Sequence, residues 1–186
     1  MEVTAGRSWH LAQDESETEV TNFELQLWRV FYGFVRWQEE CEKSTNDTNL
    51  TGHELAVLHV VRMKDKPKTI SDIGRILNRN DMFNINYSLR KLMQKGLVKK
   101  SRSGKGVKAF FYEITAKGIE DTDAWSKMRR DVLISAFMKD KTIPLKEMAN
   151  NLMKIKSIYD EADSIVAYTS LEKTDENEIP KKIKKK

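Results

Sequence analysis

The sequence lacks most of what secreted proteins and membrane proteins need. Its 186 residues include a single cysteine, Cys41, so an internal disulfide framework is excluded and a reducing compartment is expected. No apolar run reaches the length of a membrane span. The N-terminus has no apolar segment after a basic start, so we expect no secretory signal. These absences together predict a cytoplasmic protein whose length suits one domain of typical size.

Groups that perform catalysis are also scarce. Of the three histidines, His53 and His59 lie six residues apart and therefore on different faces of a helix, and no cysteine or carboxylate pair joins them at metal-ligand spacing. The chain has no glycine-rich phosphate loop, nucleophile elbow or zinc-protease helix, and the segment SGKG at 103–106 is too short for a P-loop. We therefore expect no enzyme, no cofactor and no metal site.

Positive charge is concentrated in the middle of the chain. Residues 62–110 hold fourteen Lys or Arg and three acidic residues, a net charge of +11, whereas residues 1–61 carry −7 and residues 111–186 carry +1. The modest total of +5 therefore conceals a strongly basic centre. Such a centre is the expected electrostatic footprint of a module that binds phosphate groups.

This basic centre has the pattern of two short helices. Thr69 and Asp72 predict a capping box at the start of the first helix. After a polar break of four residues, a second helix is expected to run to Lys95-Gly96, a typical C-terminal stop. The apolar positions expected to face the core are Ile70, Ile73 and Leu77, then Ile85, Leu89 and Leu92.

A hairpin is predicted to follow. Two apolar-rich runs, 97–102 and 107–114, flank the glycine-containing turn at 103–106. Helix, turn, helix and hairpin make up the plan of a winged helix, in which the second helix enters the major groove of DNA. The predicted fold is therefore mainly α, an α+β winged helix-turn-helix lobe at residues 51–114 with a separate lobe formed by the N- and C-terminal helices.

Four segments, in this order and spacing, resemble the MarR family of winged-helix transcription regulators. They are LTGHELAVL at 50–58, ISDIG at 70–74, LMQKGLV at 92–98 and ITAKG at 114–118. The likeness covers roughly residues 22–171 and implies a homodimer that binds an inverted-repeat DNA operator. Such regulators usually carry an Asp-Arg-Arg-like element in the wing that reaches the minor groove. Here Gly106-Val107-Lys108 stands in that place, which puts the minor-groove contact in doubt.

The outer helices predict the dimer interface. An N-terminal helix at residues 21–43 is apolar on most of its circumference and needs cover on both sides. Within the C-terminal helices at 115–171, the last helix has Pro144 in its first turn and carries a seam of period 3.5. Residues 1–20 are expected to form a flexible arm and residues 172–186 a disordered basic tail. The predicted dimerisation residues are Phe23, Leu27, Phe31, Leu145, Met148, Leu152, Ile155, Tyr159 and Val166.

The DNA contacts are predicted from residue types that bind phosphates or base edges. Arg reads guanine, Asn reads adenine, and Lys neutralises phosphate. The predicted DNA-binding residues are Thr69, Ser71, Arg79, Asn80, Asn84, Asn86, Tyr87, Arg90, Lys91, Arg102, Lys105 and Lys108. Phe83 touches a thymine methyl group in one interpretation and packs under the wing in the other.

Several alternatives remain open at this stage. The winged helix could belong to a dimeric adaptor that does not read DNA, or the basic patch could bind RNA. Cys41 is a redox sensor or a buried small apolar residue, and the three glutamates beside it favour the second by raising its pKa. Met148, Met153 and the aromatic residues of the first helix either line the pocket of a small-molecule effector, whose identity the sequence does not indicate, or belong to the core.

Overall fold

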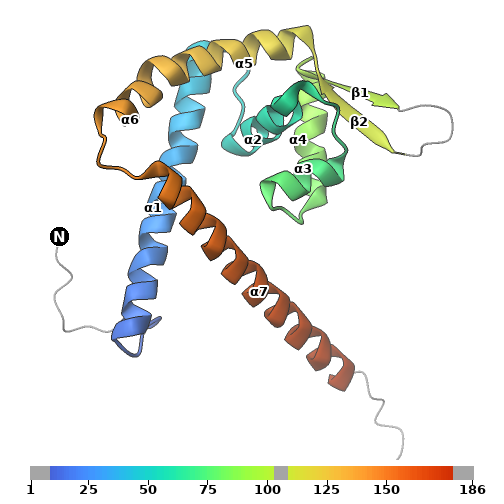
Figure 1. Cartoon of the computed structure of the whole chain (residues 1–186). Helices are drawn as coiled ribbons and strands as arrows, with labels where there is room; N and C mark the ends of the chain where they lie inside the picture. Colours follow the sequence, from blue (N-terminus) through green and yellow to red (C-terminus); the bar gives the residue numbers. More distant parts are fainter. Residues whose placement is uncertain (1–8, 103–108, 178–186) are drawn as a thin grey trace, which may run out of the picture. The chain divides into compact units, whose positions relative to one another are not determined.

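The computed structural model describes residues 9–102 and 109–177, with side chains up to Ser170. Residues 1–135 and 136–186 form two compact units, which are treated separately below. The chain is mainly helical with one small antiparallel sheet, as predicted (Figure 1). The elements of the first unit are α1 (Glu15–Thr45), α2 (Gly52–Arg62), η1 (Met63–Asp65), α3 (Ile70–Leu77), α4 (Met82–Gln94), β1 (Val98–Arg102), β2 (Phe110–Ile114), α5 (Ala116–Met128) and η2 (Arg129–Ile134).

The two capping boxes that start α2 and α3 are both formed. The Thr51 side chain accepts from the Glu54 amide while the Glu54 carboxylate accepts from the Thr51 amide at 2.9 Å. Thr69 and Asp72 make the same reciprocal pair, with both distances at 3.1 Å. Each pair satisfies two amides that the helix itself leaves unbonded, so the local sequence sets where both helices begin.

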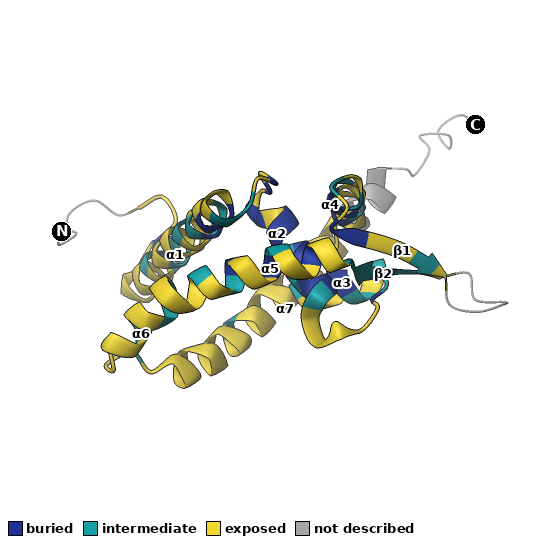
Figure 2. Ribbon diagram, turned by 90° about the horizontal axis from the view of Figure 1, so that it is seen from above, coloured by how far each residue is buried: buried dark blue, intermediate teal, exposed yellow. Residues whose placement is uncertain are grey.

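The core of the first unit lies between α2, α3, α4 and the base of the hairpin. Thirteen buried apolar residues form one cluster, and the inward side chains of α4, such as Ile85, Leu89 and Leu92, are fully buried in it. Figure 2 shows the buried residues concentrated on these helices. The hairpin pairs Val98 with Ile114 and Arg102 with Phe110, which confirms the predicted two-stranded wing.

Lys68 joins the end of α2 to the sheet. Its side chain is 7% exposed, and its ammonium donates to the carbonyls of Val61, Met63 and Lys66. Its backbone exchanges two hydrogen bonds with Tyr112 of β2, at 2.8 and 3.1 Å. A lysine can be buried in this way because three carbonyl oxygens replace its water, although burial still lowers its pKa.

The first helix begins earlier than predicted. The helix α1 starts at Glu15, so the flexible arm expected at residues 1–20 is wrong from residue 15 onward, and residues 1–8 lie outside the described part. Asp14 explains the difference, because its carboxylate accepts from the Glu17 amide at 2.9 Å and caps the helix. Acidic residues in the first turn then complement the helix dipole.

The far end of α1 packs on the winged-helix core. The Glu39 carboxylate accepts from the Gly52 amide at 2.8 Å at the start of α2. A Cβ atom at Gly52 would lie 2.8 Å from the side chain of Val35, so only glycine allows the two helices to approach this closely. A second tight contact occurs at Gly118, where a Cβ would lie 2.3 Å from the Leu97 carbonyl oxygen.

The helix that follows Thr115 is interrupted. A stretch of π-helix at Arg129–Ile134 follows α5 and shifts the helical phase. Trp125 is consequently buried while Val132 is 53% exposed. The π stretch leads directly into α6 (Ser135–Lys139).

The second unit contains α7 (Leu145–Asn177), a single long helix. It begins directly after Pro144, whose carbonyl accepts from the Met148 amide at 3.0 Å. Five of the six dimerisation residues predicted on this helix are exposed, and Ile155 is half-buried. Figure 2 accordingly draws most of α7 as exposed.

His59 of α2 is half-buried and packs against Trp125 of α5. Its ring centroid lies 4.4 Å from that of Trp125, and its Nε2 atom has no hydrogen-bond partner among the described residues. Burial, followed by the positive charges of Arg62 and Arg129, lowers the pKa of His59 from 6.5 to about 4. The native state therefore holds this imidazole neutral.

We predict that His59 makes the protein sensitive to acid. The unfolded chain binds a proton at His59 below pH 6.5 and the folded chain only below about pH 4, so stability is full above 6.5 and falls between these values. The total loss is about 3 kcal/mol. His59→Phe should flatten this part of the pH profile in urea unfolding at fixed protein concentration, while the exposed His53→Gln should not. Equal pH profiles for His59→Phe and wild type would contradict the assignment.

Candidate nucleic-acid interface

The buried face of α4 determines which of its side chains point outward. Ile85, Leu89 and Leu92 are fully buried. With 3.6 residues per turn, the line directly opposite them is formed by residues 83, 87, 90 and 94. Phe83 is 81% exposed and Tyr87 61%, and Arg90 and Gln94 are exposed as well. We call Phe83, Tyr87, Arg90 and Gln94 the outward stripe.

This geometry fixes the positions of two further side chains of α4. Phe83 does not pack under the wing, because most of its surface is exposed. Asn84 does not share the line of Arg90 but lies beside it, and its amide donates to the Asp81 carboxylate at 3.0 Å. Asn86, on the other side of the outward stripe, is half-buried.

Lys91 was predicted as a DNA contact, but its ammonium already has a partner. It lies 2.8 and 3.0 Å from the two carboxylate oxygens of Glu54, whose side chain is 5% exposed. The Lys91 side chain itself is one-third exposed. This ion pair ties the start of α2 to α4 and neutralises a buried carboxylate. We therefore assign Lys91 a structural role, which is to hold α4 against the start of α2.

The turn between α3 and α4 is held by a second ion pair. The Arg79 guanidinium donates twice to the Asp81 carboxylate, and these bonds, followed by the one from Asn84, lower the pKa of Asp81 well below its usual range. Thr69 is engaged in its capping box. Ser71 and Asn80 are exposed and have no such structural role among the described contacts.

The hairpin carries exposed cations as well. Lys100 and Arg102 stand on the same face of β1 as buried Val98 and lie over the Phe110 ring, at 3.6 and 4.8 Å from its centroid. Burial raises the pKa of Tyr112, the cross-strand partner of Lys100, and the positive charge of nearby Arg90 acts against this rise. Helix and hairpin therefore present one basic surface, formed by Arg90, Lys100 and Arg102.

The prediction from the sequence omitted Lys100. The alternation of a β-strand could have identified it, because Val98 is buried and residues two apart share a face. Lys105, Lys108 and the segment Gly106-Val107-Lys108 lie outside the described residues.

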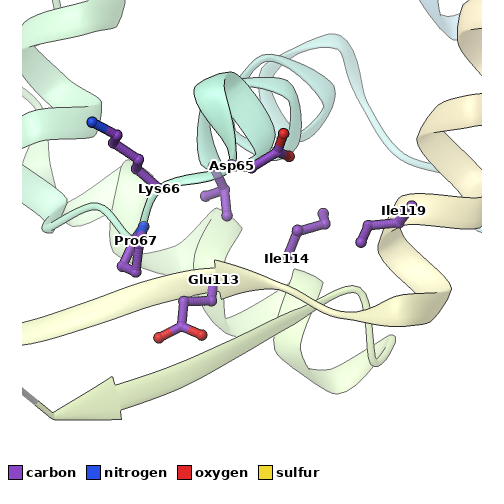
Figure 3. A pocket seen from close by; sticks show the side chains of 7 residues that line it. Asp65, Lys66, Pro67, Glu113, Ile114 and Ile119 are labelled. Atoms are coloured by element: carbon purple, nitrogen blue, oxygen red, sulfur yellow. The ribbon is translucent and has the colours of Figure 1, made fainter.

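A shallow pocket of about 230 Å³ lies away from this surface. Figure 3 shows Ile114 of β2 and Ile119 of α5 close together in it, with Asp65, Lys66 and Pro67 on the other side. None of its lining residues belongs to the outward stripe or to the basic surface. The pocket is therefore separate from the candidate interface.

The remaining candidate groups have structural surroundings. Cys41 is buried, and its thiol lies 3.9 Å from the Trp125 carbonyl oxygen. Burial, and then the charge of Glu42, raises the pKa of this thiol, which favours the inert interpretation over the redox sensor. Within residues 9–102 and 109–177, no three His, Cys, Asp or Glu side chains gather as a metal site. None of the helices searched is both long and apolar enough to cross a membrane.

The comparisons agree with this geometry. Residues 50–118 match the family model of a winged helix DNA-binding domain. No curated protein matches the sequence at a significant level. Among solved structures, a MarR/EmrR family transcriptional regulator from an Acinetobacter species shares 12% identity at a TM-score of 0.64, covering 76% of this chain and 96% of its own.

Two further neighbours were solved as complexes, one with DNA and one with a small molecule. The Staphylococcus aureus MepR–DNA complex shares 15% identity at a TM-score of 0.59, covering 73% of this chain and 96% of its own. CouR from Rhodococcus jostii, bound to p-coumaroyl-CoA, shares 15% identity at a TM-score of 0.62, covering 72% of this chain and 90% of its own. At these identities the likeness establishes the fold, which is that of MarR family transcription regulators.

The neighbouring residues Arg90 and Lys91 should behave differently when each is replaced by alanine. Lys91→Ala leaves the buried Glu54 carboxylate without its cation, so we expect a loss of about 1–2 kcal/mol in the free energy of unfolding, reduced from the value for a fully buried pair because Lys91 is partly exposed. Arg90→Ala, on the exposed face, should change this free energy by less than about 0.5 kcal/mol. Urea unfolding measures both, and equal losses would contradict the assigned directions.

Proposed function

We propose that this protein is a transcription regulator of the MarR type that binds double-stranded DNA in a sequence-specific manner as a homodimer. The single observation that carries the proposal is the exposed surface formed by the outward stripe of α4 together with Lys100 and Arg102 of the hairpin. It lies within residues 50–118, the part of the chain that matches a winged helix DNA-binding domain. A recognition helix beside a basic wing is the arrangement with which this fold class contacts DNA.

The distribution of ion pairs supports this use of the surface. The acidic side chains nearest to it are already paired with cations, namely Asp72 with Arg75, Asp81 with Arg79, Glu54 with Lys91 and Glu113 with Lys99. Arg90, Lys100 and Arg102 form no ion pair with any described residue, so their charges remain available for phosphates or base edges. The neighbour MepR was solved as a complex with DNA.

In the proposed complex, α4 lies in the major groove. Arg90 reads a base edge, Tyr87 and Asn80 contact bases or phosphates, and Ser71 binds phosphate near the start of α3. Lys100 and Arg102 hold the backbone beside the groove. Thr69, Arg79 and Lys91 position these groups through the structural bonds described above.

A second copy of the chain is proposed to cover the apolar surface of α1. Trp28 and Tyr32 stack at 5.7 Å between ring centroids, and both are 58% exposed. Phe31 meets Tyr32 edge-on, and Phe34 is half exposed. A contiguous apolar patch of this kind is rarely left open on a soluble monomer.

The seam of α7 gives the second part of the proposed dimer interface. Leu145, Met148, Leu152 and Val166 are between 45% and 65% exposed. A two-fold axis through these helices would set the spacing of the two α4 helices, and therefore an inverted-repeat operator with half-sites about one helical turn apart. We further propose a cytoplasmic location, where the DNA is, and a small-molecule effector as a partner. The likeness to CouR, which was solved with p-coumaroyl-CoA bound, supports the second proposal.

The DNA contacts can be tested with a duplex selected by the purified protein from a random-sequence pool. Arg90→Ala should lose about 1–3 kcal/mol of binding free energy for this duplex and little for a scrambled one. Lys100→Ala should weaken both duplexes and reduce the salt slope by about one, because one phosphate contact is removed. Fluorescence anisotropy at several salt concentrations measures all of these.

The matched control is Lys99→Ala, because Lys99 stands on the opposite face of β1 and pairs with Glu113. It should leave affinity nearly unchanged. If the pool yields no preferred sequence, the proposal is wrong, and the result supports the alternative of a winged-helix adaptor that does not read DNA. If Lys99→Ala and Lys100→Ala act alike, the hairpin face is assigned wrongly.

The dimer can be tested by placing charge on the seam of α7. Leu152→Asp combined with Ile155→Asp should give a monomer or an aggregate in sedimentation and an affinity near that for nonspecific DNA, because the second half-site is no longer bound intramolecularly. Asn151→Asp adds a charge next to the seam, and removal of residues 178–186 takes away only the lysine-rich end of the predicted tail. Both controls should remain dimeric. A wild-type protein that is monomeric at micromolar concentration and still binds fully would contradict the dimer.

A further inference from the structure

Phe83 stands out from the rest of the chain by its exposure. At 81% it is the most exposed large apolar side chain that the structure describes. It is the second residue of α4 and lies on the outward stripe, one turn before Tyr87. Removal of a phenylalanine ring from water is favourable. Because the ring of Phe83 is exposed in the folded chain, its burial by a binding partner would contribute to the free energy of binding.

The surroundings of Phe83 indicate what covers it. The ring is followed along the stripe by Tyr87 and then Arg90, and the exposed amide side chains of Asn80 and Asn84 lie near the same end of the helix. A protein partner would be expected to meet an apolar surface of several residues here, whereas this ring is surrounded by groups that bind phosphates and base edges. The charge and the amide donors therefore fit DNA.

The major groove contains one apolar group, the 5-methyl group of thymine, and apolar side chains are the ones that contact it. In recognition helices the N-terminal residues are those that reach the base edges. We infer that Phe83 reads a thymine methyl group in each half-site of the DNA, so the bound sequence has a T·A pair opposite the first turn of α4. This inference rests on the proposed function and specifies the DNA that the same surface takes.

The assignment divides the outward stripe into two kinds of readers. Phe83 distinguishes bases by the presence of a methyl group, and its contact is insensitive to salt because no charge is involved. Arg90 distinguishes bases by hydrogen bonds to acceptors and contributes to the salt dependence. Tyr87 lies between them. Because the methyl group is read by Phe83 alone, loss of the Tyr87 hydroxyl group should not affect that reading.

The experiment replaces thymine by uracil, which differs only in lacking the methyl group. A duplex selected from a random-sequence pool with the wild-type protein is synthesised with uracil at one thymine position at a time. We expect one thymine in each half-site at which this exchange weakens binding about fourfold, the factor that corresponds to one buried carbon group. At the other thymines the exchange should have no effect.

The protein variants complete a double-mutant cycle. Phe83→Ala should bind the thymine and uracil duplexes equally, and its helical content should be unchanged because the side chain is exposed. Tyr87→Phe and Arg90→Ala are the matched controls on the same stripe. Each should keep the fourfold ratio between the two duplexes, whatever its own effect on affinity.

The outcomes separate this inference from the proposed function. Sequence-specific binding that is indifferent to uracil at every thymine, or a fourfold ratio that persists in Phe83→Ala, would overturn the methyl-reading role and leave a DNA-binding regulator. Selection that enriches no sequence at all would overturn both. A ratio lost only in Phe83→Ala would support both.

Discussion

Complete burial of one face of α4 is the constraint from which the rest of the interface follows. Ile85, Leu89 and Leu92 have no exposed surface, so the helix cannot rotate without exposing them. The helical period then directs Phe83 and Arg90 to the opposite side. Functional side chains on this helix need no contacts of their own to be oriented, and their exposed ends remain free to bind.

The cations of the first unit fall into two groups, those that bind within the protein and those that are free to bind DNA. Lys68 and Lys91 are cations that complete the core, one by satisfying three carbonyls and the other by neutralising Glu54. Their removal would cost stability whether or not DNA is present. Arg90, Lys100 and Arg102 make no ion pair with described residues, so their charge is available for a polyanion. Only some of the cations in the basic segment are therefore available to bind DNA.

Local rules made much of the fold predictable. The predicted capping box at Thr69 involves residues three apart, and the turn of the hairpin lies between its own strands, so neighbouring residues in the sequence were enough to predict both. The start of α1 was not predicted although its signal is also local. Asp14, which caps this helix, lies in a polar stretch without an apolar pattern that would indicate a helix.

The assignments at the site that the structure changes depend on contacts over long distances in the sequence. Lys91 was taken as a DNA contact because its partner Glu54 is 37 residues away, and no local pattern joins the two. Phe83 was open to two interpretations because its type suggests packing, whereas the phase set by Ile85 and Leu89 places it outside. Lys100 was omitted although the alternation of a β-strand places it on the face of apolar Val98, which the structure shows to be buried. The exposed apolar faces of α1 and α7 were apparent from their periodicity, but periodicity does not identify what covers them.

Hydrogen exchange of the backbone amides, with and without a duplex selected by the protein, tests the central claim most directly. If the outward stripe of α4 enters the groove and the hairpin lies beside it, exchange should slow in Met82–Gln94 and in the two strands Val98–Arg102 and Phe110–Ile114. The junction between α1 and α5 should show little change. Protection restricted to that junction, with α4 unchanged at saturating DNA, would contradict the account.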